Sequence, residues 1–146
     1  MMKQTIILIT GGFDPIHSGH IAYIQAARKL GDILIVGVNS DGWLERKKGK
    51  AFLPWEERAK IVESIKGVHF VLGFDDTDGS ARDAIHEVRK LYPDAIIVFG
   101  NGGDRTSTNI PEMDIKDDKL TFVFGVGGED KKNSSSWILN NWNQEK

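Results

Sequence analysis

Short apolar runs alternate with amphipathic segments along this chain. Five runs are rich in β-branched residues and almost continuously apolar, as expected of strands covered on both faces. These runs are residues 5–10, 33–39, 68–74, 95–99 and 120–124. Segments with the helical spacing of apolar residues lie between and after them, at 21–30, 54–64, 80–92 and in a terminal segment that ends at Trp142. The alternation predicts the α/β class, a Rossmann-like open sheet of about five mainly parallel strands with flanking helices.

Length and composition narrow the classes of function. A chain of 146 residues has the length of a single domain, and we place that domain at residues 1–146. The net charge of −2 offers no general attraction to nucleic acid or to an anionic membrane, so any phosphate site must be local. The absence of cysteine excludes disulfides and thiolate catalysis. The first apolar run is too short for a signal peptide, and no run is long enough to cross a bilayer, so we expect a cytoplasmic protein.

The stretch 11–20, Gly-Gly-Phe-Asp-Pro-Ile-His-Ser-Gly-His, joins the first predicted strand to the first predicted helix. A glycine and proline turn in this place is typical of a phosphate site, because the amides of the helix start point at the loop. His17 and His20 are three residues apart, so both can project from one face toward one ligand. There, an imidazole can donate a hydrogen bond to a phosphate oxygen. The alternative is that both are surface or capping residues, and zinc is disfavoured because no cysteine completes a site.

Residues 12–20 resemble the His-x-Gly-His signature of the cytidylyltransferase-like nucleotidyltransferases, and the resemblance continues through 26–32 and 36–41. Length and spacing are most similar to the small glycerol-3-phosphate cytidylyltransferases and to the adenylyltransferase domain that makes ADP-heptose. The resemblance implies transfer of a nucleotidyl group, first CMP from CTP, to a phosphorylated small molecule such as glycerol 3-phosphate, with release of pyrophosphate. The alternatives are an adenylyltransferase that uses ATP and a sugar phosphate of the heptose 1-phosphate type, or a non-catalytic nucleotide-binding module. A homodimer is also implied.

The resemblance also implies roles for individual residues. His17 and His20 would stabilise the charge on the transferring phosphoryl group and on the leaving pyrophosphate, and Lys47 would hold the acceptor phosphate. Contacts with the nucleoside triphosphate are implied for Gly12, Phe13, Asp14, Gly19, Asp104, Arg105, Ser134 and Ser135. Contacts with the phosphorylated sugar or polyol are implied for Lys47, Lys48 and Arg58. No protein metal site is predicted, since Mg²⁺ would arrive with the triphosphate, and Asp14 is the nearest carboxylate.

Several of these positions have plain structural alternatives. Residues 46–50 carry four cations in five positions, which is most often a solvated loop. Because this segment follows the carboxyl end of the second predicted strand, it can also reach the ligand of the histidine loop. For Arg58 the alternative is an ion-pairing residue on a helix. The carboxylates within 75–78 are more typical of a turn than of a metal site.

A second family signature, an arginine-bearing loop that ends in serine and threonine, is only partly present. Ser134 and Ser135 match its end, but Glu129 and Asp130 stand near the place of the arginine. This acidic pattern resembles the heptose adenylyltransferases and weakens the case for CTP. A lysine at 131 or 132 would then supply the missing charge.

Two other classes of function are disfavoured. Residues 100–106 are rich in glycine, but they lack the spacing of a dinucleotide fingerprint and follow the fourth predicted strand instead of the first. A Rossmann dehydrogenase is therefore not expected. Nucleic-acid binding is not expected either, because the chain has no basic face.

Overall fold

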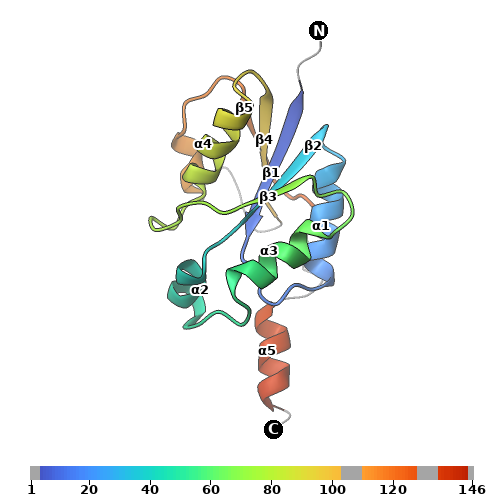
Figure 1. Ribbon diagram of the computed structural model, residues 1–146, viewed down its shortest axis with the longest axis vertical. Helices are drawn as coiled ribbons and strands as arrows, with labels where there is room; N and C mark the ends of the chain where they lie inside the picture. The colour runs from blue at the N-terminus through green and yellow to red at the C-terminus, as the bar shows by residue number, and fades with distance from the viewer. Residues whose placement is uncertain (1–3, 103–109, 128–134, 145–146) are drawn as a thin grey trace.

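The computed structural model describes residues 4–102, 110–127 and 135–144. In chain order the elements are β1 (Thr5–Gly11), α1 (Ser18–Arg28), β2 (Ile33–Val38), α2 (Asp41–Lys48), α3 (Trp55–Glu63), β3 (Phe70–Leu72), α4 (Arg82–Leu91), β4 (Ile96–Gly100), the 3₁₀ helix η1 (Pro111–Asp114), β5 (Leu120–Val123) and α5 (Ser135–Gln144). Within these ranges the strand order is β3-β2-β1-β4-β5 and every pairing is parallel. The predicted α/β class with a Rossmann-like parallel sheet is confirmed (Figure 1).

The strands are apolar on both faces because helices cover both faces. Alternate residues of a strand point to opposite sides, so β1 contributes to two separate clusters. Ile7 packs in one cluster with Ile24 of α1 and Val62 of α3, whereas Leu8 packs in the other with Ile85 of α4. Figure 1 shows α1 and α3 on one side of the sheet and α4 on the other. This arrangement leaves the carboxyl ends of the strands, and the loops that follow them, as the place for a site.

The segment after β2 differs from the prediction. Residues 46–50 were expected to form a loop, but most of them are the last turn of helix α2. Ser40 caps this helix, since its Oγ accepts the backbone N–H of Trp43 at 3.1 Å. Gly49 follows the helix with φ 95°, a conformation that glycine adopts readily. The basic residues of the last turn therefore lie where the helix dipole favours positive charge.

Other elements also differ from the prediction at their ends. β3 occupies only three residues of the predicted run 68–74, and the short 3₁₀ helix η1 lies between β4 and β5. Trp142 of α5 is 60% exposed. In the described part of the chain, none of the helices combines the length and the apolar character that crossing a membrane requires.

Candidate functional site

His17 and His20 form a reciprocal cap at the start of α1. The Nδ1 atom of His17 accepts the backbone N–H of Gly19 at 3.0 Å, and Nδ1 of His20 accepts the backbone N–H of His17 at 3.2 Å. The two rings stack with their centroids 3.9 Å apart. Because each Nδ1 accepts a hydrogen bond, each neutral ring carries its proton on Nε2, as inferred from this network. The capping interpretation thus describes Nδ1 of each ring, and the proton of each neutral ring lies on Nε2.

His20 is held in the neutral form. Burial, together with the nearby His17, Lys47 and Lys48, lowers the pKa of His20 to about 3. The ring of Phe13 packs edge-on against the His20 ring with 5.0 Å between centroids, which contributes to this burial. Phe13 itself has φ 51°, the left-handed region that residues other than glycine rarely adopt. His20 is therefore suited to donate a hydrogen bond from Nε2, not to act as a cation.

Helix α2 brings two lysines close to the histidines. The Nζ atom of Lys47 lies 4.7 Å from the ring centroid of Trp43, within the range of a cation–π contact. Both Lys47 and Lys48 are near enough to His20 to affect its pKa. The structure therefore brings together the histidine loop and the basic segment, as predicted from their positions after β1 and β2. Local positive charge arises in this way in a chain whose net charge is −2.

Asp14 and Lys48 fasten the loop after α2 to the histidine loop. The Lys48 ammonium lies 3.2 Å from Oδ2 of Asp14 and also donates to the carbonyl of the same residue. The Asp14 carboxylate is buried, and it accepts the backbone N–H of Phe52 at 2.6 Å and of Leu53 at 2.8 Å. Both oxygens of Asp14 are thus used by the protein. Among the described residues no cluster of three or more His, Asp or Glu side chains could hold a metal.

Arg58 joins the loops that surround the site. Its side chain is 0% exposed, so a substrate does not reach it in this structure, and the ion-pairing alternative describes its contacts. Nη1 donates to the carbonyls of Gly12 at 2.9 Å and Asn39 at 2.7 Å. Nε donates to the carbonyl of Leu53 at 2.9 Å, and Nη2 pairs with Asp41 at 2.5 Å. Arg58 therefore positions three loops.

Two glycines predicted to contact nucleotide also have contacts within the protein. A Cβ at Gly12 would lie 2.8 Å from Cδ2 of Leu44, so this glycine lets α2 approach the end of β1. Gly19 lies in the first turn of α1, where its N–H bonds to His17. Both support the histidine loop, and a contact with nucleotide at either position stays a prediction.

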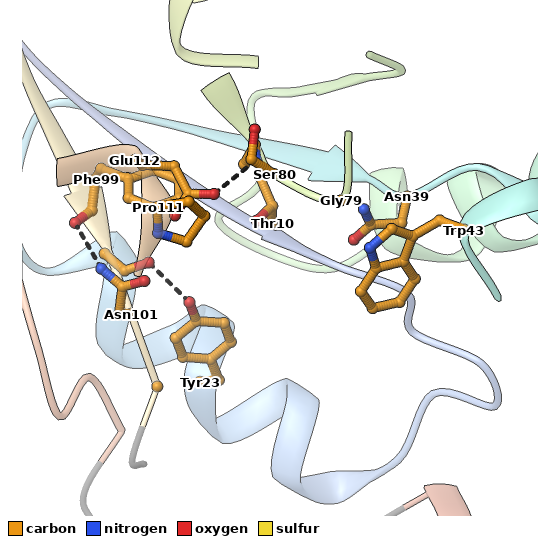
Figure 2. Close-up of a pocket in the computed structure, with 13 residues that line it drawn as sticks. Thr10, Tyr23, Asn39, Trp43, Gly79, Ser80, Phe99, Asn101, Pro111 and Glu112 are labelled. Atoms are coloured by element: carbon orange, nitrogen blue, oxygen red, sulfur yellow. Dashed lines mark hydrogen bonds between the residues drawn. The ribbon is translucent and has the colours of Figure 1, made fainter. Parts of the chain in front are cut away.

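A pocket of about 210 Å³ opens beside this loop, at the carboxyl edge of the sheet. Among the side chains that line it are those of Thr10, Tyr23, Asn39, Trp43, Asn101 and Glu112 (Figure 2). It lies at the point where the strand order reverses, because β2 pairs with one side of β1 and β4 with the other. Open α/β sheets bind ligands at such switch points.

Sequence reasoning located one part of this pocket and missed others. Gly100 and Gly102, from the glycine-rich stretch after the fourth strand, line it. Tyr23 was missed, although it lies one turn after His20 on α1. Glu112 was missed because nothing near it in the sequence indicates a site; the crossover from β4 to β5 brings it there.

Several predicted residues lie outside the described part of the chain. Asp104, Arg105 and Ser134 fall in this group, as do residues 129–132. Ser135 begins α5, but its side chain is also outside the description. Their contacts with nucleotide stay predictions.

Comparison with known proteins gives consistent matches. A sequence model of the cytidylyltransferase-like family matches residues 8–123. The "Bifunctional protein HldE" of Syntrophotalea carbinolica is 30% identical over 146 residues, which is 97% of this chain and 28% of that protein. The protein of the same name from Nitratiruptor sp. is 37% identical over 114 residues, which is 77% of this chain and 23% of the relative. The chain thus corresponds to only part of these relatives.

Solved structures with low sequence identity share the fold. A putative nicotinate-nucleotide adenylyltransferase from Vibrio parahaemolyticus superposes with a TM-score of 0.65 at 18% identity, covering 98% of this chain and 89% of that one. A lipopolysaccharide core biosynthesis protein from Thermoplasma volcanium gives a TM-score of 0.64 at 20% identity, covering 89% of this chain and 99% of that one. These likenesses support the architecture alone.

Proposed function

Since this chain belongs to the cytidylyltransferase-like family, we propose that it is a nucleotidyltransferase that transfers an adenylyl group from ATP to a sugar phosphate of the heptose 1-phosphate type. Relatives named HldE at 30% and 37% identity support this choice. So do the resemblance to the domain that makes ADP-heptose and the acidic residues at 129–130. The proposal reverses the order expected from the sequence, in which CTP and glycerol 3-phosphate came first.

The observation that carries the proposal is the pair of neutral imidazoles at the start of α1. Each has Nδ1 bonded to backbone, so each presents an Nε2–H donor. They lie where the helix N-terminus and the α2 lysines favour an anion. Phosphoryl transfer needs no covalent nucleophile from the protein. It needs groups that position the two substrates and neutralise their charge, and a site of this kind can supply them.

The reaction would proceed by in-line attack. An oxygen of the acceptor phosphate forms a new bond to the α-phosphorus of ATP while the bond from that phosphorus to the bridging oxygen breaks, and the electron pair leaves on pyrophosphate. His17 and His20 would donate hydrogen bonds to the oxygens that gain negative charge. Lys47 would neutralise the acceptor phosphate as it approaches. Ser134 and Ser135 are proposed to bind the β- and γ-phosphate oxygens.

Mg²⁺ bound to the triphosphate would neutralise part of its charge. The described residues do not supply a protein cage for this ion, because Asp14, the nearest carboxylate, already accepts two backbone N–H groups and a lysine. The ligands of Mg²⁺ would therefore be mainly triphosphate oxygens and water. The homodimer implied by the family resemblance stays a prediction.

The test is pyrophosphate release by the purified protein with Mg²⁺, ATP or CTP, and heptose 1-phosphate or glycerol 3-phosphate. We expect release with ATP and the heptose phosphate. Release with CTP and glycerol 3-phosphate alone would restore the first expectation. If no pair of substrates releases pyrophosphate but the protein still binds the triphosphate, the non-catalytic module would be favoured.

A matched pair of variants tests the role of the imidazole. In His17→Asn the amide oxygen takes the position of Nδ1 and keeps the cap, but the Nε2–H donor is lost. We expect kcat to fall by about 10²-fold or more with little change in stability. His86→Asn, on the exposed face of α4, is the control and should leave kcat unchanged. Near-normal turnover of His17→Asn would overturn the assignment.

A further inference from the structure

We infer that the pocket at the carboxyl edge holds the uncharged, hydroxyl-rich part of the acceptor, and that Glu112 determines specificity by accepting hydrogen bonds from its hydroxyl groups. The inference rests on the proposed function, since it concerns the acceptor of that reaction. It adds a residue that no sequence motif indicates, on the crossover between β4 and β5.

The charge of the pocket restricts what can enter it. Among the described residues that line it, Glu112 is the one Asp, Glu, Lys or Arg side chain. A carboxylate with no lining cation opposes a second phosphate or a carboxylate on the ligand. It favours an uncharged ligand with hydrogen-bond donors, and a sugar or polyol presents a hydroxyl donor on nearly every carbon.

Both side-chain amides of the pocket already donate to acceptors of the protein. The Nδ2 group of Asn39 donates to the carboxylate of Asp76 at 3.0 Å. Nδ2 of Asn101 lies 3.4 Å from the carbonyls of both Phe99 and Val123. These partners can only accept, so they fix the orientation of both amides and turn the Oδ1 atoms away.

Three side-chain oxygens of the lining residues remain as acceptors. Oε2 of Glu112 accepts the backbone N–H of Ala81 at 2.7 Å, which holds the carboxylate in place. No hydrogen bond within the described residues reaches Oε1 of Glu112 or Oδ1 of Asn39 and Asn101. No buried side-chain oxygen of the described residues lacks a partner, so these three oxygens are not fully buried, and all three belong to residues that line the pocket (Figure 2). Three acceptors around one space fit hydroxyl donors.

The position of the pocket fits the same acceptor. Trp43 lines it and carries Lys47 over its ring, and Tyr23 lines it one helical turn after His20. One edge of the pocket therefore adjoins the cationic end of the site, where the acceptor phosphate would bind. The hydroxyl-bearing carbons would extend from there toward Glu112.

The test is Glu112→Gln with heptose 1-phosphate and ATP as substrates. The amide oxygen can still accept the Ala81 N–H, while the second carboxylate oxygen becomes an NH₂ group. We expect the KM for the sugar phosphate to rise roughly 10-fold to 100-fold, the range for a hydrogen bond to a charged acceptor. The KM for ATP should stay within about twofold of wild type. Glu87→Gln, an exposed ion-pairing residue of α4, is the matched control and should change neither value.

Two further outcomes separate the inference about Glu112 from the proposed function. A rise in the KM for ATP instead would mean that the pocket holds the nucleobase, which overturns the inference and leaves the proposed function standing. Calorimetric binding of heptose 1-phosphate distinguishes the inference from the proposed function, because it needs no turnover. Weaker binding to Glu112→Gln by a protein that releases no pyrophosphate would support the inference and refute the proposed function.

A second measurement avoids the variant altogether. Wild-type protein is assayed with sugar phosphates that each lack one hydroxyl group. At least one analogue should show a KM raised about tenfold or more. Equal KM values for all analogues, or no binding of any sugar phosphate, would overturn the inference.

Discussion

Arg58→Lys tests whether this residue positions the site or binds substrate. The lysine keeps the charge, but a single ammonium replaces a planar fork whose three nitrogens reach Leu53, Gly12, Asn39 and Asp41. We expect at least two of these four hydrogen bonds to be lost. The Arg58 side chain is entirely buried, so water does not replace the missing donor.

The expected size follows from those contacts. A buried acceptor left without its donor costs about 1–3 kcal/mol, so two lost bonds should lower the free energy of unfolding by roughly 3–4 kcal/mol. For a chain of 146 residues this corresponds to a fall in Tm of about 10 °C. Because the loops of Gly12 and Asn39 flank the site, a shift near 1 Å should also lower kcat, by up to about 10²-fold.

The assay is thermal unfolding by circular dichroism, with kcat measured well below both midpoints. Arg46→Lys is the control: its side chain is 50% exposed and lies 3.8 Å from the Asp76 carboxylate. Arg46 also donates to the Asp76 carbonyl at 2.8 Å, but water reaches this half-exposed side chain and can replace a lost donor, so its Tm should fall by no more than about 3 °C. An Arg58→Lys variant that unfolds at the wild-type temperature but shows a raised KM for substrate would refute the positioning role.

Two further predictions concern His20 and Asp14. The pKa of His20 is about 3 in the folded protein and 6.5 in the unfolded chain, so the unfolded state alone binds the proton as pH falls below 6.5. The stability that this neutral histidine contributes is present above pH 6.5 and is lost between pH 6.5 and pH 3. The free energy of unfolding is measured with urea at pH 7 and pH 5, and wild type should lose about 2 kcal/mol more than His20→Asn. Equal losses in the two proteins would contradict the burial of His20. Asp14→Asn should lower the free energy of unfolding by about 1–3 kcal/mol through the Phe52 and Leu53 amides, yet leave the Mg²⁺ concentration for half-maximal activity within about twofold. A tenfold higher Mg²⁺ requirement would make Asp14 a metal ligand.

The fold could be predicted from the sequence because the strands are buried on both faces. Runs such as 5–10 and 33–39 are apolar at almost every step, and short β-branched runs of this kind are typical of the central strands of a parallel sheet. Helix α2 was missed since Leu44 is its one buried residue, which leaves no apolar periodicity to detect. Its signals were the cap at Ser40 and the glycine at 49, and both also suit a polar loop.

The site could be predicted only as far as local sequence carries it. His17 and His20 lie close together in the chain, so their motif is enough to predict a common ligand. Glu112 and Asn39 meet through the topology of the sheet, which no short motif records. Arg58 resembles an ordinary exposed arginine of an amphipathic helix, and its burial follows from loops that close over it.

The fastening of residues 49–53 by Asp14, Lys48 and Arg58 has a consequence for motion. A surface loop usually opens at little cost, but this one shares its hydrogen bonds with the histidine loop and the end of β2. The three segments therefore belong to one cooperative unit, and local unfolding of one exposes the others. We therefore expect the wall that carries the proposed phosphate contacts to stay closed during turnover, and the opposite wall to set the rate at which ligands exchange.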